Sequence, residues 1–333
     1  MLGFSIIICT YNPNREIFIR LLNAISNFSD CDLPLEIFIV DNNSTDDLAS
    51  EKIVLEFLQK HEIATLISEP NPGLTEARIT GIKSAKYDWV IFFDDDNEPQ
   101  ANYLIEVSKI INEYKGVGAW GPGNVIVEYE NNFYEKKFSH VKELFQQRSE
   151  NFVRTSNKNW WQDCYPAGTG LVVRKDIGVV YSKYVTSGMY SLTDRKGKSL
   201  CSGGDLQLVL TAIKMGFSAG VHPALKVTHV IGKERLSTDY LKNLSFGTAA
   251  ANVPGHLQVW NDLDPHNFAP PSNQYIFKQA YHHLKVKLHQ DGIIKTEISF
   301  CALLGAWSAL YKLNPIVKPS FFYKLFCKFL RVS

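Results

Sequence analysis

Three consecutive aspartates, Asp94, Asp95 and Asp96, directly follow the apolar run Trp89–Phe93 in this chain of 333 residues. Adjacent carboxylates repel one another, and burying them without a partner is costly. A hard divalent cation prefers oxygen ligands and often bridges to the phosphates of a substrate, so an Asp-x-Asp pair at the end of a strand can bind one. We therefore predict a metal site at Asp94 and Asp96. The alternative is a solvated turn in which Asp96 caps the next helix.

The elements that would position these aspartates alternate along the N-terminal part of the chain. Apolar runs typical of buried strands cover residues 4–10, 35–41, 64–68 and 89–93, and helical patterns cover residues 16–28, a stretch ending near 60, 74–84 and 103–114. This alternation predicts an α/β fold, with a parallel sheet and helices on both of its faces. The alternation breaks at Val117, and we expect residues 128–165 to form an irregular region over a site. We expect a strand near 170–176, a helix at 204–217, a strand at 224–230 and helices from there to the C-terminus.

Polar clusters follow three of the predicted strands, at the edge of the sheet where α/β proteins bind ligands. They comprise residues 94–96, residues 41–44, and Thr10, Tyr11 and Asn12. Asp41 could accept a hydrogen bond from a base or ribose, or it could form an Asx turn into Ser44. Arg78 follows a Pro-Gly turn and could reach the same edge, or it could lie on the surface. The chain contains neither GxxxxGK[ST] nor a GxGxxG after the first strand, which argues against the phosphate-binding loops of ordinary ATPases and dinucleotide-binding folds.

The composition excludes some classes of protein and predicts a location. The net charge of +1 does not indicate a nucleic-acid partner, and 45% apolar with 21% charged residues is typical of a globular protein. The six cysteines form no CxxC pair, so we expect a reducing, cytoplasmic compartment. The N-terminus shows no basic segment or cleavage site, and we expect no signal peptide. The longest apolar stretch, residues 298–313, falls short of the roughly 20 residues that span a membrane, so we expect no transmembrane helix.

The C-terminal part of the chain is basic. From Lys278 onward, nine Lys and Arg residues stand against two acidic ones, a net charge of +7 that leaves −6 for residues 1–277. In the last helical pattern, Phe321, Phe322, Leu325, Phe326, Phe329 and Leu330 share one face, and Lys324, Lys328 and Arg331 share the other. An aromatic face opposite a basic face suits an anionic membrane surface. The alternative is a helix docked on the protein with its basic face in solvent.

Six segments, taken together, resemble family 2 glycosyltransferases with the GT-A fold. They are IIICTYN, VDNNSTDD, NPGLTEARITG, FFDDDNEP, AGTGLVVRKD and GGDLQLVLTAIKMGF followed by VTHV, and they span roughly residues 3–232. The resemblance implies a GT-A domain over residues 1–232, and the remainder, residues 233–333, would be a helical extension. It also implies transfer of a sugar, of the hexosyltransferase type, with inversion. The donor would be a nucleotide-diphosphate sugar, with a UDP-sugar expected, the cofactor Mg²⁺ or Mn²⁺, and the acceptor a glycan or lipid-linked hydroxyl in polysaccharide or other surface glycan assembly.

The resemblance also assigns roles to residues. The nucleotide would contact Thr10, Tyr11, Asn12, Asp41, Arg78, Asp94 and Asp95. The metal would be bound by Asp94 and Asp96, with His229 near the metal or diphosphate, and Asp205 would be the catalytic base. The alternative for His229 is a histidine that is simply packed at a strand end. The sugars would lie near Gly168, Thr169, Gly170 and Gly204. Trp160 and Trp161 are candidates to stack on an acceptor sugar, with core packing as the alternative.

One position departs from the family pattern. Gly204 stands where the family carries a Glu before the base, which leaves a single carboxylate, and Asp205 could instead cap its helix. This departure supports a rival function, a catalytically silent protein that binds a nucleotide sugar. A nucleotidyltransferase would need a glycine-rich loop after the first strand, and residues 9–16 contain no glycine.

Overall fold

The central strand of the sheet, β1 (Phe4–Thr10), is buried along its whole length. Its side chains alternate between the two faces: Ile7 and Cys9 join the hydrophobic core on one face, and Ile6 and Ile8 join the core on the other. A strand that is covered on both faces has no polar side, which explains the uninterrupted apolar run in the sequence.

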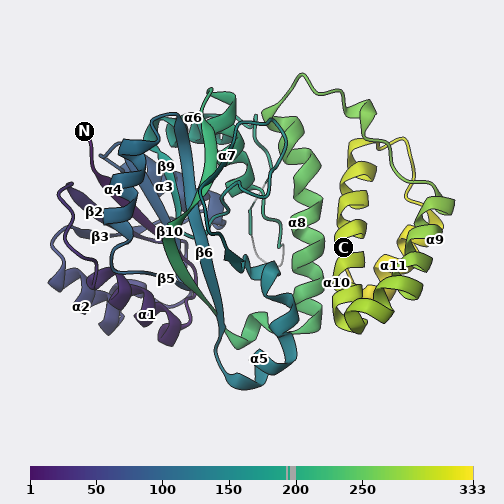
Figure 1. The fold of residues 1–333 in the computed structure, drawn as a ribbon, viewed down its shortest axis with the longest axis horizontal. Helices are drawn as coiled ribbons and strands as arrows, with labels where there is room; N and C mark the ends of the chain where they lie inside the picture. Colours follow the sequence, from purple (N-terminus) through teal and green to yellow (C-terminus); the bar gives the residue numbers. More distant parts are fainter. Residues whose placement is uncertain (193, 196–199, 333) are drawn as a thin grey trace.

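The protein is described here by a computed structural model that covers residues 1–192, 194, 195 and 200–332. The sheet has the strand order β3-β2-β1-β4-β9-β6-β10-β5, with β7 paired to β6 and β8 paired to β10 (Figure 1). Beside β1, the strands are β2 (Leu35–Asp41), β3 (Ala64–Ser68), β4 (Trp89–Asp94), β5 (Asn97–Pro99), β6 (Val117–Tyr129), β7 (Arg148–Ser149), β8 (Arg154–Ser156), β9 (Leu171–Arg174) and β10 (Ser218–Ile231). The strands β1 to β4 are mutually parallel, whereas β9 runs antiparallel between β4 and β6. The predicted mostly parallel α/β fold is therefore confirmed.

Helices cover both faces of the sheet, as the alternation predicts. One face packs against α1 (Arg15–Ser26), α2 (Lys52–Lys60) and α4 (Tyr103–Glu113). The other packs against α3 (Leu74–Ser84), α6 (Lys175–Thr186) and α7 (Gly204–Lys214). Helix α3 places its first turn beside the carboxyl ends of β1 and β2, which brings its polar residues toward the site.

The sequence prediction is wrong about the region after Val117. A 13-residue strand, β6, begins there and pairs with β10, which starts six residues before the predicted strand. Within residues 128–165, the structure has α5 (Asn132–Phe138), a 3₁₀ segment (Ser139–Phe145) and the short strands β7 and β8. Glycine residues interrupt the apolar pattern of β6, so this strand is not recognised from the sequence. They are needed because a Cβ at Gly118 would lie 2.5 Å from Ile177, and one at Gly121 would lie 2.5 Å from Pro166.

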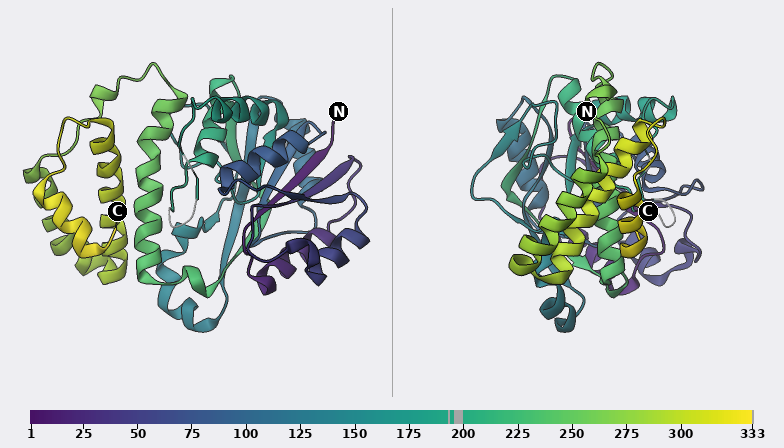
Figure 2. Two further views of the ribbon diagram at one scale, coloured as in Figure 1. Left: turned by 180° about the vertical axis from the view of Figure 1, so that it is seen from behind. Right: turned by 90° about the vertical axis from the view of Figure 1, so that its right-hand side faces the viewer.

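The C-terminal part of the chain is helical, as predicted, and its helices form a layer that packs against α7 through α8 (Figures 1 and 2). They are α8 (Thr238–Val259), α9 (Asn273–His282), α10 (Leu288–Leu313) and α11 (Phe321–Leu330). Helix α10 runs alongside α8, and α9 and α11 lie on its far side (Figure 1). Residue 232 falls between the end of β10 and the start of α8, and the division into two domains there stays a prediction.

The apolar stretch of residues 298–313 is part of a longer helical segment than the sequence predicts. It belongs to the 22-residue segment Gly292–Leu313 of α10, whose mean hydropathy of 1.4 and length would suffice to cross a membrane. Half of its most apolar window is buried inside the protein. A core helix of the C-terminal layer would have the same apolar composition and would also be partly buried.

The close approach of α10 to α8 generates a prediction about stability. A Cβ at Gly305 would lie 2.1 Å from the carbonyl oxygen of Phe246, so the two helices pack backbone to backbone there. We expect Gly305→Ala to lower the free energy of unfolding by about 1–2 kcal/mol, because overpacking costs more than the better helix propensity of Ala returns. Urea denaturation measures the change. Gly116→Ala is the matched control, since nothing lies within 4 Å of its Cβ, and it should stay within about 0.5 kcal/mol of the parent. An unchanged Gly305→Ala protein would contradict this packing.

Candidate active site

A cavity of about 560 Å³ opens at the carboxyl ends of β1 and β4. Its lining includes Thr10, Tyr11, Asn12, Asp94, Asp95 and Asp96. The parallel register explains this convergence, because Cys9 lies opposite Asp94 in the pairing of β1 with β4. Tyr11 is 56% exposed and leaves its ring free at the cavity. The polar clusters of the first and fourth strands therefore meet, as the sequence predicts. We call this space the donor-side cavity.

Asp41 has a structural partner at the end of β2. Its Oδ1 accepts a hydrogen bond from the backbone N–H of Ser44 at 3.1 Å, which is the Asx turn that the sequence left as an alternative. Its neighbour Asn42 lines the donor-side cavity and holds the turn before α3, because its Oδ1 accepts from the N–H of Gly73 at 2.7 Å. A contact between Asp41 and a nucleotide base stays a prediction.

Asp95 is the central carboxylate of the three aspartates, and its surroundings disfavour its charge. Its Oδ2 accepts a hydrogen bond from the hydroxyl of Thr10 at 2.7 Å. Burial, together with the charge of Asp96, raises the pKa of Asp95 to about 7, and the hydrogen bond from Thr10 acts in the opposite direction. One of the three repelling charges is thus partly removed by protonation.

Asp96 is neutralised by cations rather than by protonation. Its Oδ2 forms an ion pair with Nη1 of Arg235 and lies 3.2 Å from Nε2 of His229. Asn97, which is fully buried, donates from its side-chain amide to Oδ1 of Asp96 at 2.8 Å. Although burial opposes ionisation of Asp96, the charges of His229 and Arg235 hold the pKa of its carboxyl below the usual range.

The spacing of Asp96 and His229 resembles that of two ligands of one metal ion, and a bound ion would compete with Arg235 for Oδ2 of Asp96. The Nδ1 of His229 faces the carbonyl oxygen of Phe145 at 2.9 Å, and because that oxygen can only accept, Nδ1 carries a proton and Nε2 is directed to Asp96. Two ligands at about 2.1 Å in octahedral geometry lie about 3 Å apart, close to the observed 3.2 Å. Among the described residues, no group of three or more His, Cys, Asp or Glu is arranged to hold a metal. If a metal binds here, Asp96 and His229 would supply two ligands, and substrate oxygens or water would complete the shell, as is usual for Mg²⁺.

Arg78 is buried, so the sequence alternative of a surface arginine is wrong. Only 3% of the residue is exposed, and its Nη1 donates to Oδ2 of Asp194 at 2.7 Å in a buried ion pair. A Cβ at Gly168 would lie 2.6 Å from its Nη2, and a Cβ at Gly204 would lie 3.1 Å from its Nη1. The guanidinium therefore fills a space that exists only because both positions are glycine.

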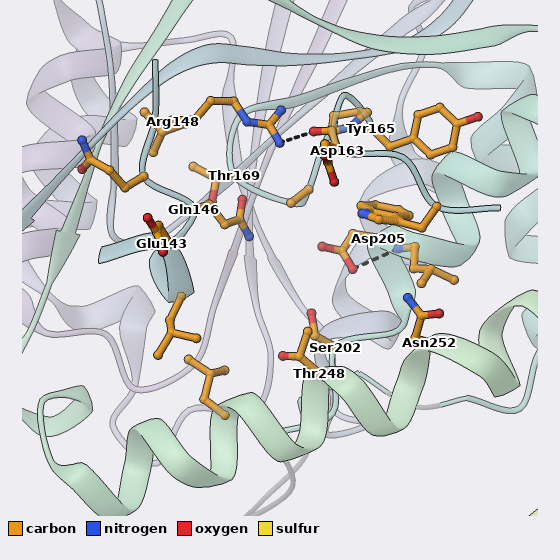
Figure 3. Close-up of a pocket in the computed structure, with 18 of the residues that line it drawn as sticks. Glu143, Gln146, Arg148, Asp163, Tyr165, Thr169, Ser202, Asp205, Thr248 and Asn252 are labelled. Atoms are coloured by element: carbon orange, nitrogen blue, oxygen red, sulfur yellow. Dashed lines mark hydrogen bonds between the residues drawn. The ribbon is translucent and has the colours of Figure 1, made fainter. Parts of the chain in front are cut away.

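Asp205 lies at the start of α7 and faces a second cavity, of about 520 Å³, which we call the acceptor-side cavity. Its Oδ2 accepts from the N–H of Gly168 at 3.0 Å, and its Oδ1 accepts from the N–H of Leu206 at 2.9 Å. The residue that caps α7 is Gly203, so Asp205 is not the N-cap that the sequence left as an alternative. Two backbone hydrogen bonds hold the carboxylate while one side stays open to the cavity (Figure 3).

The remaining predicted sugar-binding residues separate into two groups. Thr169 and Trp161 line the acceptor-side cavity together with Thr248 and Asn252 of α8 (Figure 3). Trp160 instead stacks on His256, with ring centroids 3.9 Å apart, and on Phe268. Packing thus accounts for Trp160, and a stacking role stays open for Trp161 alone. Gly170 adopts φ +64° and its carbonyl accepts from the hydroxyl of Tyr103 at 2.6 Å, which anchors the loop that carries Gly168.

Three charged residues belong to the site although the sequence did not predict them. Arg235 binds Asp96, Asp194 binds Arg78, and Arg195 lines both cavities. Arg235 follows His229 by six positions, and this spacing beyond a strand end could have drawn attention to it. Asp194 and Arg195 lie outside any periodic pattern, and we find no local signal that predicts them.

Comparison with known proteins places this geometry in a family. The family model described as Glycosyl transferase family 2 matches residues 5–177. Glycosyltransferase GlyA of Streptococcus pneumoniae is 29% identical over 175 residues, which cover 48% of this chain and 24% of GlyA. An uncharacterized glycosyltransferase of Haemophilus influenzae is 31% identical over 93 residues, which cover 28% of this chain and 29% of that protein. The chain thus spans less than a third of the length of each of these curated relatives.

Solved structures share the fold. The mannosyltransferase PcManGT from Pyrobaculum calidifontis, in complex with GDP-Man and Mn²⁺, superposes with a TM-score of 0.52 at 17% identity and covers 98% of this chain and 84% of its own. GalNAc-T7, with UDP, GalNAc and Mn²⁺, gives a TM-score of 0.50 at 16% identity and covers 74% of this chain and 47% of its own. Since the family model spans more than half of the sequence and the sheet is that of GT-A enzymes, the chain belongs to glycosyltransferase family 2.

Proposed function

We propose that this protein is a metal-dependent, inverting glycosyltransferase of the hexosyltransferase type that moves a sugar from a UDP-sugar to a hydroxyl of a glycan or lipid-linked acceptor. The observation that carries the proposal is the pair of cavities. The donor-side cavity holds the aspartates, the acceptor-side cavity holds Asp205, and Arg195 lines both. A donor bound in one cavity can therefore present its sugar to an acceptor bound in the other.

On the donor side, Asp96 and His229 would bind Mg²⁺ or Mn²⁺. A metal held there would supply positive charge to the diphosphate leaving group. Arg195 also faces this cavity and brings a positive charge to the same place. The exposed ring of Tyr11 is available to the nucleoside. PcManGT and GalNAc-T7, each solved with Mn²⁺ and a nucleotide, favour this assignment by analogy.

On the acceptor side, Asp205 would accept the proton of the attacking hydroxyl. Its two backbone hydrogen bonds fix the carboxylate, and general-base catalysis requires such positioning. Asp194 is 2% exposed and paired with Arg78, so it is not open to attack a sugar. Glu143 and Asp163 also line this cavity. With Asp205 as the base, the acceptor oxygen would displace the diphosphate directly, which inverts the anomeric carbon.

The C-terminal layer supports a peripheral location on an anionic membrane, on its cytoplasmic side. Helix α11 packs inward through Phe322 and Phe326, while Phe321, Leu325 and Phe329 are 67%, 45% and 77% exposed. The sequence predicted a single apolar face on α11. In the structure, part of that face packs against the protein and part is exposed to solvent. Helix α9, beside α11, adds the exposed side chains Phe277 and Tyr281, at 55% and 54%. Exposed aromatic residues among Lys278, Lys324 and Lys328 match the chemistry of an anionic lipid surface. A lipid-linked acceptor in polysaccharide or surface glycan assembly would be reached from this position.

Metal-dependent binding of nucleotide tests the donor side. In a thermal-shift panel of nucleotide sugars, we expect UDP-sugars with Mn²⁺ to stabilise the protein by about 2.7 kcal/mol at a hundred times the dissociation constant. Asp96→Asn keeps the volume but weakens the metal ligand, so the Mn²⁺-dependent part of the shift should disappear. EDTA should have the same effect on the parent protein. Equal stabilisation of parent and variant, with and without EDTA, would exclude the proposed metal site, and a response to GDP-sugars alone would replace the UDP assignment.

The substitution Asp205→Asn tests the base. Asn keeps the size of the side chain and an oxygen for one backbone hydrogen bond, but it cannot take up the acceptor proton. Transfer should therefore fall by about 10²–10⁴-fold, with donor affinity nearly unchanged. Release of nucleotide diphosphate measures the rate. Near-normal turnover by the variant would discard Asp205 as the base. A parent protein that binds donor and never releases the nucleotide would favour the silent sugar-nucleotide-binding protein that Gly204 supports.

Vesicle flotation tests the membrane surface. The triple variant Phe321→Ser, Leu325→Ser, Phe329→Ser should lower binding to phosphatidylserine-containing vesicles by about tenfold or more, since burial of each side chain is worth roughly 1.5–3 kcal/mol. Raised salt should weaken binding by the parent protein. Ile126→Ser, which removes a 60% exposed apolar side chain from β6, is the control and should bind like the parent. Absence of binding by the parent protein would leave α11 as a docked helix only.

A further inference from the structure

The first helical position of α7, Gly204, adjoins a carboxylate from another part of the chain. A Cβ built at Gly204 would lie 2.6 Å from Oδ2 of Asp194 and 3.1 Å from Nη1 of Arg78. That oxygen of Asp194 is the one that accepts from Arg78 Nη1 at 2.7 Å. A side chain at position 204 and the carboxylate of Asp194 would therefore occupy the same space, next to the same guanidinium.

The charges around Arg78 show what this carboxylate does. Among the carboxylates around the guanidinium, Asp194 has the largest effect on its charge, followed by Asp205 and Asp94. Burial raises the pKa of Asp194 to about 6, and the charge of Arg78 opposes that rise. The Arg78 guanidinium and Asp205 also share a neighbour, since a Cβ at Gly168 would meet Arg78 Nη2 at 2.6 Å and Asp205 Oδ2 at 3.6 Å.

We propose that Asp194 is a positioning residue that supplies, from a separate segment, the carboxylate absent at position 204, and that it thereby keeps Arg78 from pairing with the base Asp205. The part of this inference that concerns the base rests on the proposed function. Its motive is geometric: one carboxylate oxygen already occupies the space beside Gly204, within hydrogen-bonding distance of Arg78. Gly204 then leaves space for Asp194, and the carboxylate of Asp194 replaces the one that Gly204 lacks.

Removal of Asp194 leads to a defined consequence for the site. A buried guanidinium without its partner is strongly unfavourable, and the next carboxylate that acts on it is that of Asp205. Asp205 would turn toward Arg78 and away from the acceptor-side cavity.

Thermal unfolding of a transplanted carboxylate tests the arrangement without any substrate. We expect Asp194→Ala to lower the Tm by roughly 5–10 °C. Adding Gly204→Asp should recover at least half of that loss, because an aspartate there holds an oxygen about as far from its Cβ as the one that Asp194 now provides. The control double variant Asp194→Ala, Gly204→Ala adds the methyl group without the charge and should recover nothing. Gly204→Asp alone should destabilise, since two carboxylates would compete for one space.

The sign of the Gly204→Asp effect decides the proposal. The proposal is supported if Gly204→Asp lowers the Tm of the parent protein but raises the Tm of the Asp194→Ala variant, because one site beside Arg78 then accepts a carboxylate from either position. If Asp194→Ala alone does not fold, recovery of folded protein by Gly204→Asp, and not by Gly204→Ala, supports it equally. A lower Tm with Gly204→Asp in both proteins, or an equal recovery of Tm by Gly204→Asp and Gly204→Ala, would overturn it.

Turnover separates positioning from stability. With the nucleotide sugar selected by the thermal-shift panel, Asp194→Ala should lower kcat by roughly 10–100-fold with little change in the KM for donor. The double variant with Gly204→Asp should restore kcat. Rescue of Tm without rescue of kcat would confine Asp194 to a structural role and overturn the positioning role. If the parent protein turns over no nucleotide sugar, the proposed function fails while the Tm comparison still decides the shared carboxylate.

Discussion

The site depends on how buried carboxylates are compensated at one edge of the sheet. The end of β4 places Asp94, Asp95 and Asp96 beside the end of β1, and burial makes each uncompensated charge costly. The unfavourable buried charge is compensated differently at Asp95 and at Asp96. Protonation is favoured at Asp95, whereas Asp96 is paired with Arg235 and lies beside His229. Buried ion pairs contribute little net stability, because desolvation offsets their attraction. Their value here is that they hold charges in fixed positions.

Glycines make this compensation feasible. A guanidinium can be buried beside α7 only where no side chain competes for the space, and positions 168 and 204 both meet that condition. Gly168 contributes twice, because its N–H also holds the carboxylate of Asp205 at 3.0 Å. The loop that carries it is set by Gly170, whose positive φ is accessible to glycine at low cost. Backbone conformation and electrostatics are therefore coupled at the junction of the two cavities.

Sequence patterns predict the part of the fold in which each strand is covered on both faces. The boundaries of β1, β2 and α3 follow from continuous apolar runs and helical periodicity, and the meeting of their polar ends follows from parallel pairing. The strand β6 could not be predicted in this way, because its glycines serve close packing against Ile177 and Pro166 and remove the apolar pattern. The pairing of Arg78 with Asp194 joins positions 116 residues apart, and no local rule relates such positions. The role of Asp41 could not be decided from the sequence either, since a polar residue at a strand end can serve its own turn as well as a ligand.

Helix α8 relates the acceptor-side cavity to the C-terminal layer. Thr248 and Asn252 face the cavity that holds Asp205, while Phe246 presents its backbone to Gly305 of α10 on the other side of the helix. Because the contact at Gly305 involves backbone atoms of both helices, α8 and α10 have little freedom to slide. The exposed aromatic side chains of α9 and α11 are carried by the same layer (Figure 2). A surface that docks on lipid through these helices would thus hold the acceptor-side cavity at a fixed height above it, which is the constraint that transfer to a lipid-linked acceptor imposes.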